Sequence, residues 1–389
     1  QELEQRLAAL FQALNQSGHQ FDSALIFNRI NQYYFTGTMQ DGVLVLRKDG
    51  SVVHFVRKSA ERAKLESPLD LVYPISSYRD LLAKLPVELG STFIEMETVP
   101  LATLERLKKY FNFAAIHPLD GIISRLRMVK SPYELDLIQE SGRQHRQLME
   151  QVVPQLLKPG ISEVEFLADL YASMVKLGHH GVSRFSVLQL EMIAGQVGFG
   201  DSSIYPTNFN GPGGMLGMSP AVPLVGNPNR HLKKGDLVFV DIGYGVQGYH
   251  SDKTQIYSFG APPDAEAVKI HQACIDVLNR TAGQLLVGAI PADIYRTVMA
   301  DLPAALGENF MGFGQERVQF LGHGVGLHID EPPVIARGFN VPLQANMVLA
   351  IEPKCGIAGR GMVGAEETFV VMPSGPVCLT GGAREIITV

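Results

Sequence analysis

The first third of the chain alternates between helical and strand patterns of apolar residues. Positions 2–14 repeat apolar side chains at helical spacing, and the short apolar run 24–27 follows as a strand. Two further β-prone runs, 42–46 and 52–56, flank an Asp-Gly pair at 49–50, which is typical of a hairpin turn. With the helical stretches that follow, this pattern predicts a small mixed α/β domain.

A strong helix start opens the rest of the chain. Ser131 suits the N-cap, Pro132 suits the first helical position, and Glu134 follows the cap by three residues, which together form a capping box. The same signal recurs at 162–165. We therefore expect an N-terminal domain over residues 1–127 and a larger domain over residues 128–389.

Two rounds of helices followed by a hairpin fill the larger domain. Helices from 131 and 162 precede one hairpin, and helices near 264–285 and 291–303 precede a second one. This repeat predicts a pseudo-symmetric domain in which the two hairpins face each other across one cleft. The expected fold class is therefore α/β (α+β). The segment 193–230 is rich in Gly, Pro, Asn and Ser, and we expect it to form a wall over the substrate.

The first hairpin carries two aspartates, Asp241 and Asp252. If Gly245 pairs with Gly248 at the turn, the two carboxylates lie directly opposite each other. Like charges in such a pair destabilise a sheet, and a cation between them would remove the conflict. Two solvated aspartates on a surface hairpin is the alternative that this pair alone leaves open.

Three further residues extend the set. His323 lies among glycines that permit close approach of backbone or ligand, Glu352 follows an apolar strand, and Glu366 opens another strand. Each is ordinary alone, but together four carboxylates and one imidazole suit hard or borderline divalent ions, with Mn²⁺ as the first choice and Co²⁺, Zn²⁺ or Fe²⁺ as alternatives. Bridging carboxylates can hold two such ions about 3.5 Å apart with a shared water or hydroxide as nucleophile. The predicted ligands of two divalent ions are Asp241, Asp252, His323, Glu352 and Glu366.

The order Asp, Asp, His, Glu, Glu, with the surroundings Val240-Asp241-Ile242-Gly243, Gly322-His323-Gly324 and Ile351-Glu352-Pro353, resembles the pita-bread metallopeptidases. This family includes prolidase, aminopeptidase P and methionine aminopeptidase, and the resemblance covers the whole chain. It implies a pita-bread catalytic domain behind a creatinase/prolidase-like first domain. It also implies removal of the first residue of a short peptide, commonly ahead of proline, by a hydroxide bridging two metal ions. In such an enzyme Glu352 would also move a proton, and a homodimer is expected.

The chain departs from this family at several places. Family members usually carry an acid five residues after the ligand histidine and a second histidine seven residues after it, whereas this chain has His328 and Asp330 there. If the segment is extended, both side chains face the cleft. We then expect His328 to hydrogen-bond the substrate or the developing oxyanion, and Asp330 to orient the imidazole. A solvated or structural His328 is the alternative. The family's substrate-facing histidine has no counterpart in 213–224, and Gly364 stands where many members have arginine.

Composition excludes several classes of binding partner. A net charge of -6 without a long basic run argues against nucleic acid, and no apolar stretch has transmembrane length. Three cysteines without metal-type spacing predict no disulfide framework and favour a reducing cytoplasm. A short peptide is the expected partner.

Two other functions stay open at the level of sequence. One is a non-enzymatic, peptide-binding relative of the same fold, which the presence of all five ligands argues against. The other is a metal-dependent enzyme with a different reaction, such as a lyase, because the fold alone does not choose the chemistry.

Overall fold

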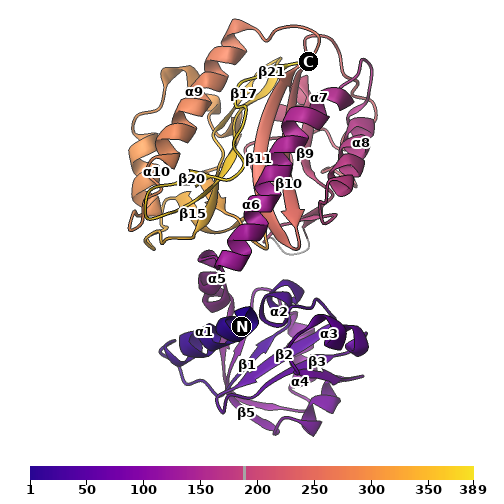
Figure 1. Ribbon diagram of the computed structural model, residues 1–389, viewed down its shortest axis with the longest axis vertical. Coiled ribbons are helices and arrows are strands. Elements are labelled where there is room, and N and C mark those ends of the chain that lie inside the picture. Colours follow the sequence, from indigo (N-terminus) through magenta and orange to yellow (C-terminus); the bar gives the residue numbers. More distant parts are fainter. Residues whose placement is uncertain (187–189) are drawn as a thin grey trace. The chain divides into compact units, whose positions relative to one another are not determined.

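The computed structural model describes residues 1–186 and 190–389. The chain divides into two compact units, Gln1–Arg127 and Met128–Val389. Among the helices that these described ranges contain, none is long and apolar enough to cross a membrane. Each unit has its own sheet system and its own buried apolar side chains (Figure 1).

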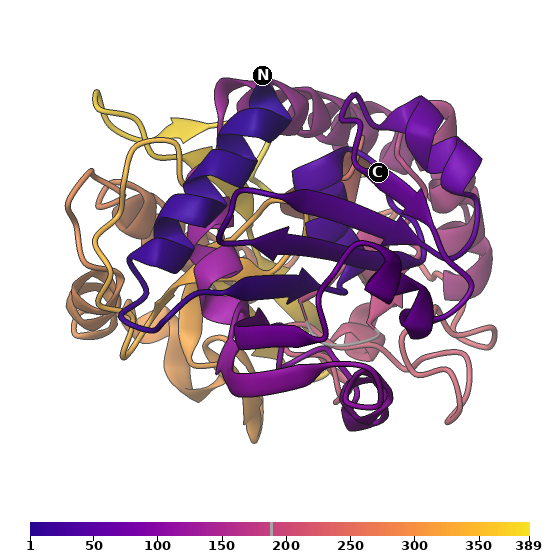
Figure 2. The same cartoon turned by 90° about the horizontal axis from the view of Figure 1, so that it is seen from below.

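The first unit is built on one mixed sheet of six strands in the order β4-β3-β2-β1-β5-β6. Its middle strands β1 to β3 are antiparallel neighbours, and β5 and β6 continue the sheet in parallel fashion (Figure 2). The predicted Asp-Gly hairpin is present between β2 and β3. The strands are β1 (Ser23–Ile26), β2 (Gly42–Arg47), β3 (Val52–Val56), β4 (Val72–Pro74), β5 (Glu88–Ile94) and β6 (Asn112–Pro118). The helices are α1 (Glu2–Asn15), α2 (Arg29–Thr36), α3 (Ala60–Glu66), α4 (Leu101–Leu107) and the connecting α5 (Asp120–Met128), with a 3-10 turn over Tyr78–Ala83.

Capping boxes start two helices of the second unit, as the sequence predicts. The Ser131 hydroxyl accepts the backbone N–H of Glu134, whose carboxylate accepts the N–H of Ser131, and Ser162 and Glu165 do the same at the start of α8. These reciprocal bonds satisfy N–H groups that a helix start otherwise leaves without partners. The helices of this unit are α6 (Pro132–Gln147), α7 (Val153–Leu156), α8 (Glu163–Lys176), α9 (Ala265–Ala282) and α10 (Pro291–Met299).

Two larger sheets form the centre of the second unit. One has the order β21-β11-β10-β9 and the other β15-β14-β16-β19-β20. A bridge between Thr254 and Glu366 joins them where β11 passes the start of β19. The strands are β9 (Gly195–Phe199), β10 (Leu237–Val246), β11 (Tyr249–Ser258), β14 (Phe320–Gly324), β15 (Glu331–Ala336), β16 (Val348–Ile351), β19 (Glu367–Val370), β20 (Val377–Cys378) and β21 (Ile387–Thr388). Short pairs are β7 (Ser183–Arg184) with β8 (Glu191–Met192), and β12 (Gly312–Phe313) with β13 (Glu316–Arg317).

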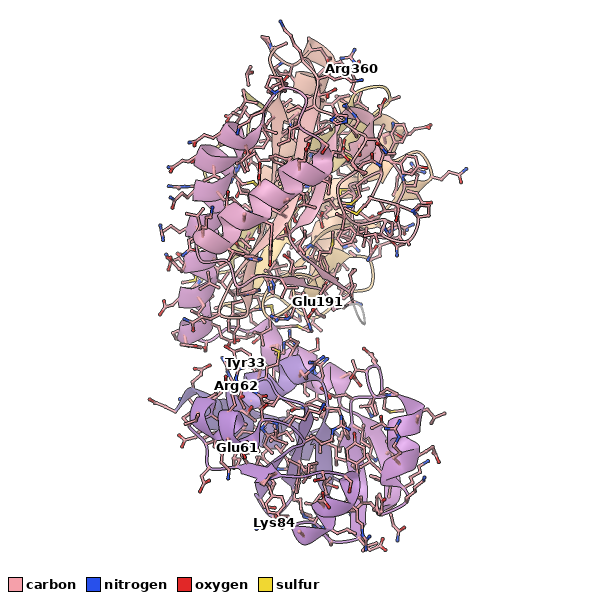
Figure 3. All side chains as sticks on the ribbon, turned by 90° about the vertical axis from the view of Figure 1, so that its right-hand side faces the viewer. Tyr33, Glu61, Arg62, Lys84, Glu191 and Arg360 are labelled. Carbon is pink, nitrogen blue, oxygen red and sulfur yellow. The ribbon has the colours of Figure 1, made fainter. Side chains whose placement is uncertain are left out.

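A separate hairpin, β17 (Lys354–Ile357) with β18 (Gly361–Gly364), extends the β16–β19 pair beyond Glu352 and Glu366. The second predicted hairpin therefore exists, but it is interrupted at its two acids. Arg360, labelled in Figure 3, lies in the turn of this hairpin. It forms an ion pair with Asp264, the N-cap residue of α9, and so connects the turn to the helix layer.

Helices cover the outer face of each sheet, and this decides which residues face inward. On β10 the even positions Val238, Val240 and Ile242 pack with residues of α8, so Asp241 points to the other face. On β16 Leu349 and Ile351 pack with residues of α9. Strand alternation on both sheets thus turns polar side chains toward the inside of the unit.

The predicted register of the first hairpin is wrong. Asp241 pairs with Thr254 and Asp252 with Gly243, because the turn consists of Gln247 and Gly248 alone. Both turn residues have positive φ, 47° and 94°, the conformation that matches a two-residue turn to the twist of the strands. The partner of each aspartate is shifted by two residues, so the two aspartates are diagonal neighbours but stay on one face.

Candidate metal centre

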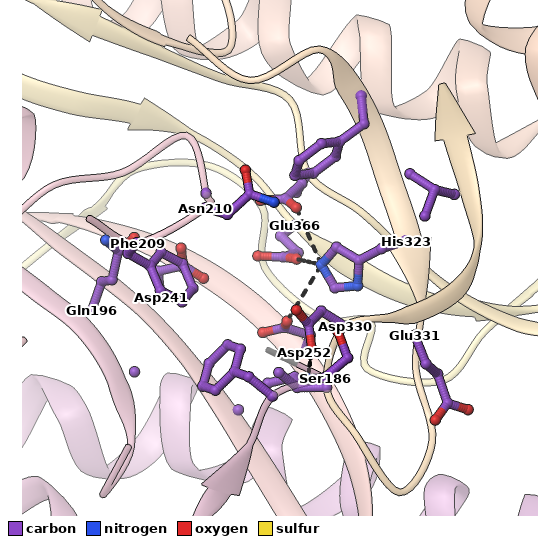
Figure 4. A pocket seen from close by; sticks show the side chains of 18 of the residues that line it. Ser186, Gln196, Phe209, Asn210, Asp241, Asp252, His323, Asp330, Glu331 and Glu366 are labelled. Atoms are coloured by element: carbon purple, nitrogen blue, oxygen red, sulfur yellow. Dashed lines mark hydrogen bonds and ion pairs between the residues drawn. The ribbon is translucent and has the colours of Figure 1, made fainter. Parts of the chain in front are cut away.

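The predicted ligands come from both sheets and meet at one cavity. Asp241 and Asp252 project from the first hairpin, His323 from β14, and Glu352 and Glu366 from the ends of β16 and β19. All five line a cavity of about 250 Å³ and are buried (Figure 4). The facing arrangement of two hairpins expected from the sequence brings these side chains together.

The five side chains form two halves, one around His323 and one around Asp241. The half around His323 offers a place for one ion. His323 Nε2 lies 3.2 Å from Glu352 Oε1, 3.9 Å from Asp252 Oδ2 and 4.0 Å from Glu366 Oε1. One ligand atom from each of Asp252, His323 and Glu366 lies within 4.8 Å of the others. Glu366 Oε1 is buried and accepts no hydrogen bond from the part of the chain that the structure describes. A buried carboxylate oxygen in that condition is costly unless a cation meets it, so this donor set fits a divalent ion.

The surroundings of His323 also suit a metal ligand, because they favour the neutral tautomer that is protonated at Nδ1. Nδ1 lies 3.2 Å from the backbone oxygen of Gly324, which a protonated Nδ1 can donate to. The lone pair of Nε2 is then directed toward the carboxylates. Fixing a ligand imidazole through its other nitrogen is the usual arrangement in metal sites.

In the other half, polar groups of the protein already surround Asp241. The Thr254 hydroxyl lies 2.9 Å from Asp241 Oδ1 and 2.8 Å from Glu366 Oε2, so it can donate to either oxygen. The second oxygen, Oδ2, accepts from the side chain of Lys354 at 3.0 Å. Both oxygens of Asp241 therefore have partners within the protein.

Lys354 is a residue of the site that the sequence reasoning missed. It is fully buried, and its Nζ lies 3.0 Å from Asp241 Oδ2, 2.8 Å from Glu352 Oε2 and 2.8 Å from Glu366 Oε2. The available signal was its position two residues after Glu352, since such residues share a face of an extended segment.

The crowded charges shift the pKa values of the carboxyl groups and the lysine. Burial raises the pKa of Asp241 to about 7 against the opposing charge of Lys354. Burial and the charges of Glu366 and Asp241 raise the pKa of Asp252 well above its ordinary range. Burial lowers the pKa of Lys354, but the charges of Asp241, Glu352 and Glu366 exceed this effect and hold it well above its ordinary value.

The pKa values of His323 and Glu352 are shifted in opposite directions. Burial lowers the pKa of His323, but the hydrogen bond and charge of Glu352 overcome it and raise the pKa to about 10. Burial raises the pKa of Glu352, and the charge of Lys354 with the His323 hydrogen bond brings it below its ordinary value. Without an ion, both nitrogens of the His323 imidazole are therefore protonated at neutral pH, and the ring is positively charged.

Sequence comparison decides the family. A model of metallopeptidase family M24 matches residues 136–373, and a model of the creatinase/prolidase N-terminal domain matches residues 6–129. The chain belongs to metallopeptidase family M24. The resemblance to pita-bread metallopeptidases is thereby confirmed, and with it the expected fold class of a mixed α/β first domain before a pita-bread domain.

Several proteins are similar to this M24 chain. A probable dipeptidase, PepE, of Mycobacterium bovis is 30% identical over 274 residues, which are 69% of this chain and 62% of that protein. An uncharacterised peptidase of Staphylococcus aureus is 26% identical over 392 residues, covering 96% of this chain and 98% of that one. The alignment with the first of these relatives thus spans less than two thirds of its length.

Solved structures show the same fold. The prolidase from Pyrococcus horikoshii superposes with a TM-score of 0.80 at 22% identity, covering 98% of this chain and 100% of that one. The Xaa-Pro dipeptidase from Bacillus anthracis superposes with a TM-score of 0.80 at 20% identity, and both chains are covered completely.

The segment after His323 differs from the expectation. Residues 326–330 form a series of bends rather than a strand, and the N–H of Gly326 donates to the backbone oxygen of His328 at 2.9 Å. The expected extended run was therefore wrong, because the chain turns here to enter β15. Asp330 lines the cavity, where its Oδ1 accepts the N–H of Ser186 at 2.6 Å, while His328 is not among the described residues that line it. The role of His328 stays a prediction.

Aromatic and aliphatic side chains make up the remaining walls. The rings of Phe185 and Phe209 pack edge to face with 5.2 Å between their centroids, and Ile329 and Phe339 also line the cavity. Phe209, with Asn210 and Gly211, belongs to the Gly- and Asn-rich segment that the sequence suggested as a wall.

We expect the affinity of the metal-free protein for Mn²⁺ to rise with pH. Protons compete with the ion, because His323 has a pKa of about 10 and the pKa of Asp252 is raised well above its ordinary range. Raising the pH from about 6 to about 9 lowers the proton concentration, so that the ion displaces these protons more easily, and should strengthen binding by about tenfold per pH unit for each proton displaced. Calorimetric titrations in buffers of different ionisation enthalpy measure both the affinity and the proton release. An affinity that is constant over this range, with no proton release, would contradict this picture of the site.

The exchanged roles of His328 and Asp330 can be tested separately from the metal. On that hypothesis His328→Ala lowers kcat by about 10² to 10³, the usual contribution of an oxyanion donor, while the metal content stays unchanged. Steady-state kinetics on the best peptide substrate, with elemental analysis of the same samples, measure the two quantities. Near-wild-type turnover would assign His328 to a structural role in the bend.

Proposed function

We propose that this chain is a metal-dependent exopeptidase that removes the N-terminal residue of short peptides, with Xaa-Pro bonds as the preferred substrates. The observation that carries the proposal is the buried cluster of four carboxylates and one imidazole at the cavity. Membership of metallopeptidase family M24 supports it, as do relatives whose names are prolidase, Xaa-Pro dipeptidase and dipeptidase.

The chemistry of the donor set favours a divalent ion between Asp252, His323 and Glu366, with Glu352 beside it. When bound, such an ion supplies a Lewis acid that polarises a peptide carbonyl and acidifies water. Oxygen and nitrogen donors suit Mn²⁺, Co²⁺, Zn²⁺ or Fe²⁺, and Mn²⁺ stays the first choice. The full set of five ligands, and a second ion held by it, stay predictions from the sequence.

The size and lining of the cavity favour a small substrate. Pockets for drug-sized ligands usually occupy roughly 300–1,000 Å³, so a cavity of about 250 Å³ suits a dipeptide or the end of a short peptide. The rings of Phe185, Phe209 and Phe339 offer apolar surface against which a proline ring can pack. Asp330 at the cavity adds an acidic group that favours a positively charged α-amine, whereas Glu331 already pairs with Lys130 at 2.9 Å. This combination supports cleavage at the amino end.

Glu352 is the group best suited to move a proton. Its Oε2 faces the ammonium of Lys354 at 2.8 Å, and its Oε1 lies 3.2 Å from His323 Nε2, beside the proposed ion, so positive charge next to both oxygens stabilises its ionised form. An ionised carboxylate at the cavity can take a proton from water and later give it to the departing amine. A homodimer and a cytoplasmic location stay predictions from the sequence.

Replacement of the proposed proton carrier should reduce catalysis strongly. Glu352→Gln keeps the shape of the side chain but removes its basicity, so kcat on an Xaa-Pro dipeptide should fall by about 10² or more, the range of general acid–base catalysis. Metal content is measured alongside, and His231→Gln is a control outside the cavity that should retain wild-type turnover. Turnover of Glu352→Gln within a few-fold of the wild type would remove Glu352 from this role.

Cleavage should require a free amino end. Peptides with N-terminal acetylation lose the charge that the acidic groups of the cavity would pair with, and we expect them to resist hydrolysis. The comparison uses matched Xaa-Pro tripeptides with free and acetylated amino ends, with Mn²⁺, Co²⁺ or Zn²⁺ added in turn and with chelator as the metal-free control. Equal cleavage of both peptides would exclude an exopeptidase of this type, and full activity in chelator would exclude a metal-dependent one.

A further inference from the structure

The Lys354 side chain ends where three carboxylates converge. An ammonium group has three hydrogens to donate, and Nζ has three carboxylate oxygens at 2.8 to 3.0 Å, one each from Asp241, Glu352 and Glu366. The donors and acceptors of this group are therefore matched in number. Among the described residues, these contacts make the ammonium the centre of the half of the cluster that contains Asp241.

An ion in this half would need the same oxygens. A divalent ion binds carboxylate oxygens at about 2.0–2.2 Å in the case of zinc, whereas the ammonium uses Asp241 Oδ2 at 3.0 Å and Glu366 Oε2 at 2.8 Å. The remaining oxygen of Asp241 lies 2.9 Å from the Thr254 hydroxyl. An ion placed between Asp241 and Glu366 would thus meet a cation that is already in contact with an oxygen of each carboxylate, and the two positive charges would repel.

The backbone holds Lys354 in this position. Lys354 pairs with Gly364 on β18, and its backbone oxygen accepts the N–H of Met311 at 2.8 Å. Gly364 has a φ of 140°, and a Cβ there would lie 2.6 Å from Lys354 Cα and 3.0 Å from its Cγ. The absence of a side chain at Gly364 therefore leaves room for the lysine stem. With an exposed fraction of 0%, the side chain is part of the packed interior.

The other half of the cluster keeps the features of an ion site. Asp252, His323 and Glu366 bring ligand atoms within 4.8 Å of one another, and Lys354 contacts neither Asp252 nor His323 in the structure. Glu366 divides its two oxygens between the halves, because Oε2 accepts from Lys354 while Oε1 is directed toward His323. The carboxylate oxygens of the cluster thus fall into two groups, one around the ammonium of Lys354 and one around the imidazole of His323.

We propose that the Lys354 ammonium takes the place of one of the two divalent ions expected from the sequence, so that the centre holds a single ion between Asp252, His323 and Glu366. The inference rests on the proposed function for the presence of that ion, but the number of ions is independent of whether peptides are cleaved. In this arrangement Asp241 is a partner of Lys354 rather than a metal ligand. Lys354 is accordingly a positioning residue, which fixes the carboxylates that the ion shares.

Metal counting tests the proposal directly. Metal-free protein is dialysed to equilibrium against Mn²⁺, and bound metal is measured by elemental analysis. We expect one ion per chain in the wild type and two in Lys354→Ala, which frees the oxygens of Asp241 and Glu366. Asp241→Asn should retain its single ion, whereas Asp252→Asn should lose it. Two ions in the wild type, with one of them lost in Asp241→Asn, would overturn the proposal.

A second buried lysine provides the matched control. Lys253 is 1% exposed and pairs with Glu367 at 2.6 Å, and Arg384 also contacts Glu367, so a carboxylate there keeps a cationic partner without the lysine. Lys253→Ala should bind one ion, as the wild type does, and thermal unfolding confirms that each variant is folded. Two ions in Lys253→Ala would mean that loss of any buried lysine raises the count, and would overturn the assignment to Lys354.

Electron paramagnetic resonance adds a reading that does not depend on variants. A single Mn²⁺ ion gives the resolved hyperfine pattern of an isolated ion, and a pair at bridging distance gives an exchange-coupled spectrum. We expect the isolated pattern at saturating Mn²⁺ in the wild type, and an exchange-coupled spectrum there would overturn the proposal. One bound ion without hydrolysis of any peptide would contradict the proposed function alone, while two ions with hydrolysis would contradict the single-ion centre alone.

Discussion

Four carboxylates buried in one small cluster repel one another, and the whole centre depends on how that repulsion is met. Asp241, Asp252, Glu352 and Glu366 are each less than a tenth exposed, so water does little to screen them. Burying an ionised carboxylate costs several kcal/mol unless a partner compensates it. The protein supplies one fixed cation, Lys354, and a donor set with His323 that suits a second cation. Burial, together with the charges of the neighbouring carboxylates, raises the pKa values of Asp241 and Asp252.

The fold creates this cluster by strand alternation on two facing hairpins. Helices pack on the outer faces of both sheets, which turns the odd positions of β10 and the even positions of β16 toward the interior. Bridging of Thr254 with Glu366 joins the two sheets beside Asp241. The acids therefore lie close together because the two sheets pack against each other. Burial of the apolar side chains behind them offsets the free-energy cost of burying the carboxylates.

The sequence predicts the elements, and which acids meet at one cavity, far better than the distances between side chains. Capping boxes at Ser131 and Ser162 depend on local spacing and are read directly. The register of β10 and β11 depends on the conformation of two turn residues, and Gln247 gave no sign of its positive φ. The bends at 326–330 arise from tertiary packing before β15, so the expected strand there failed. Lys354 was missed because a lysine among acids reads as a solvated residue until burial is known.

Anomalous diffraction from crystals of the Mn²⁺-loaded protein tests the account most directly, because it locates each ion and Lys354 in one experiment. The account predicts a single anomalous peak between Asp252, His323 and Glu366, with Lys354 Nζ still in contact with Asp241. Two peaks in the cluster, with the lysine turned away from Asp241, would contradict it.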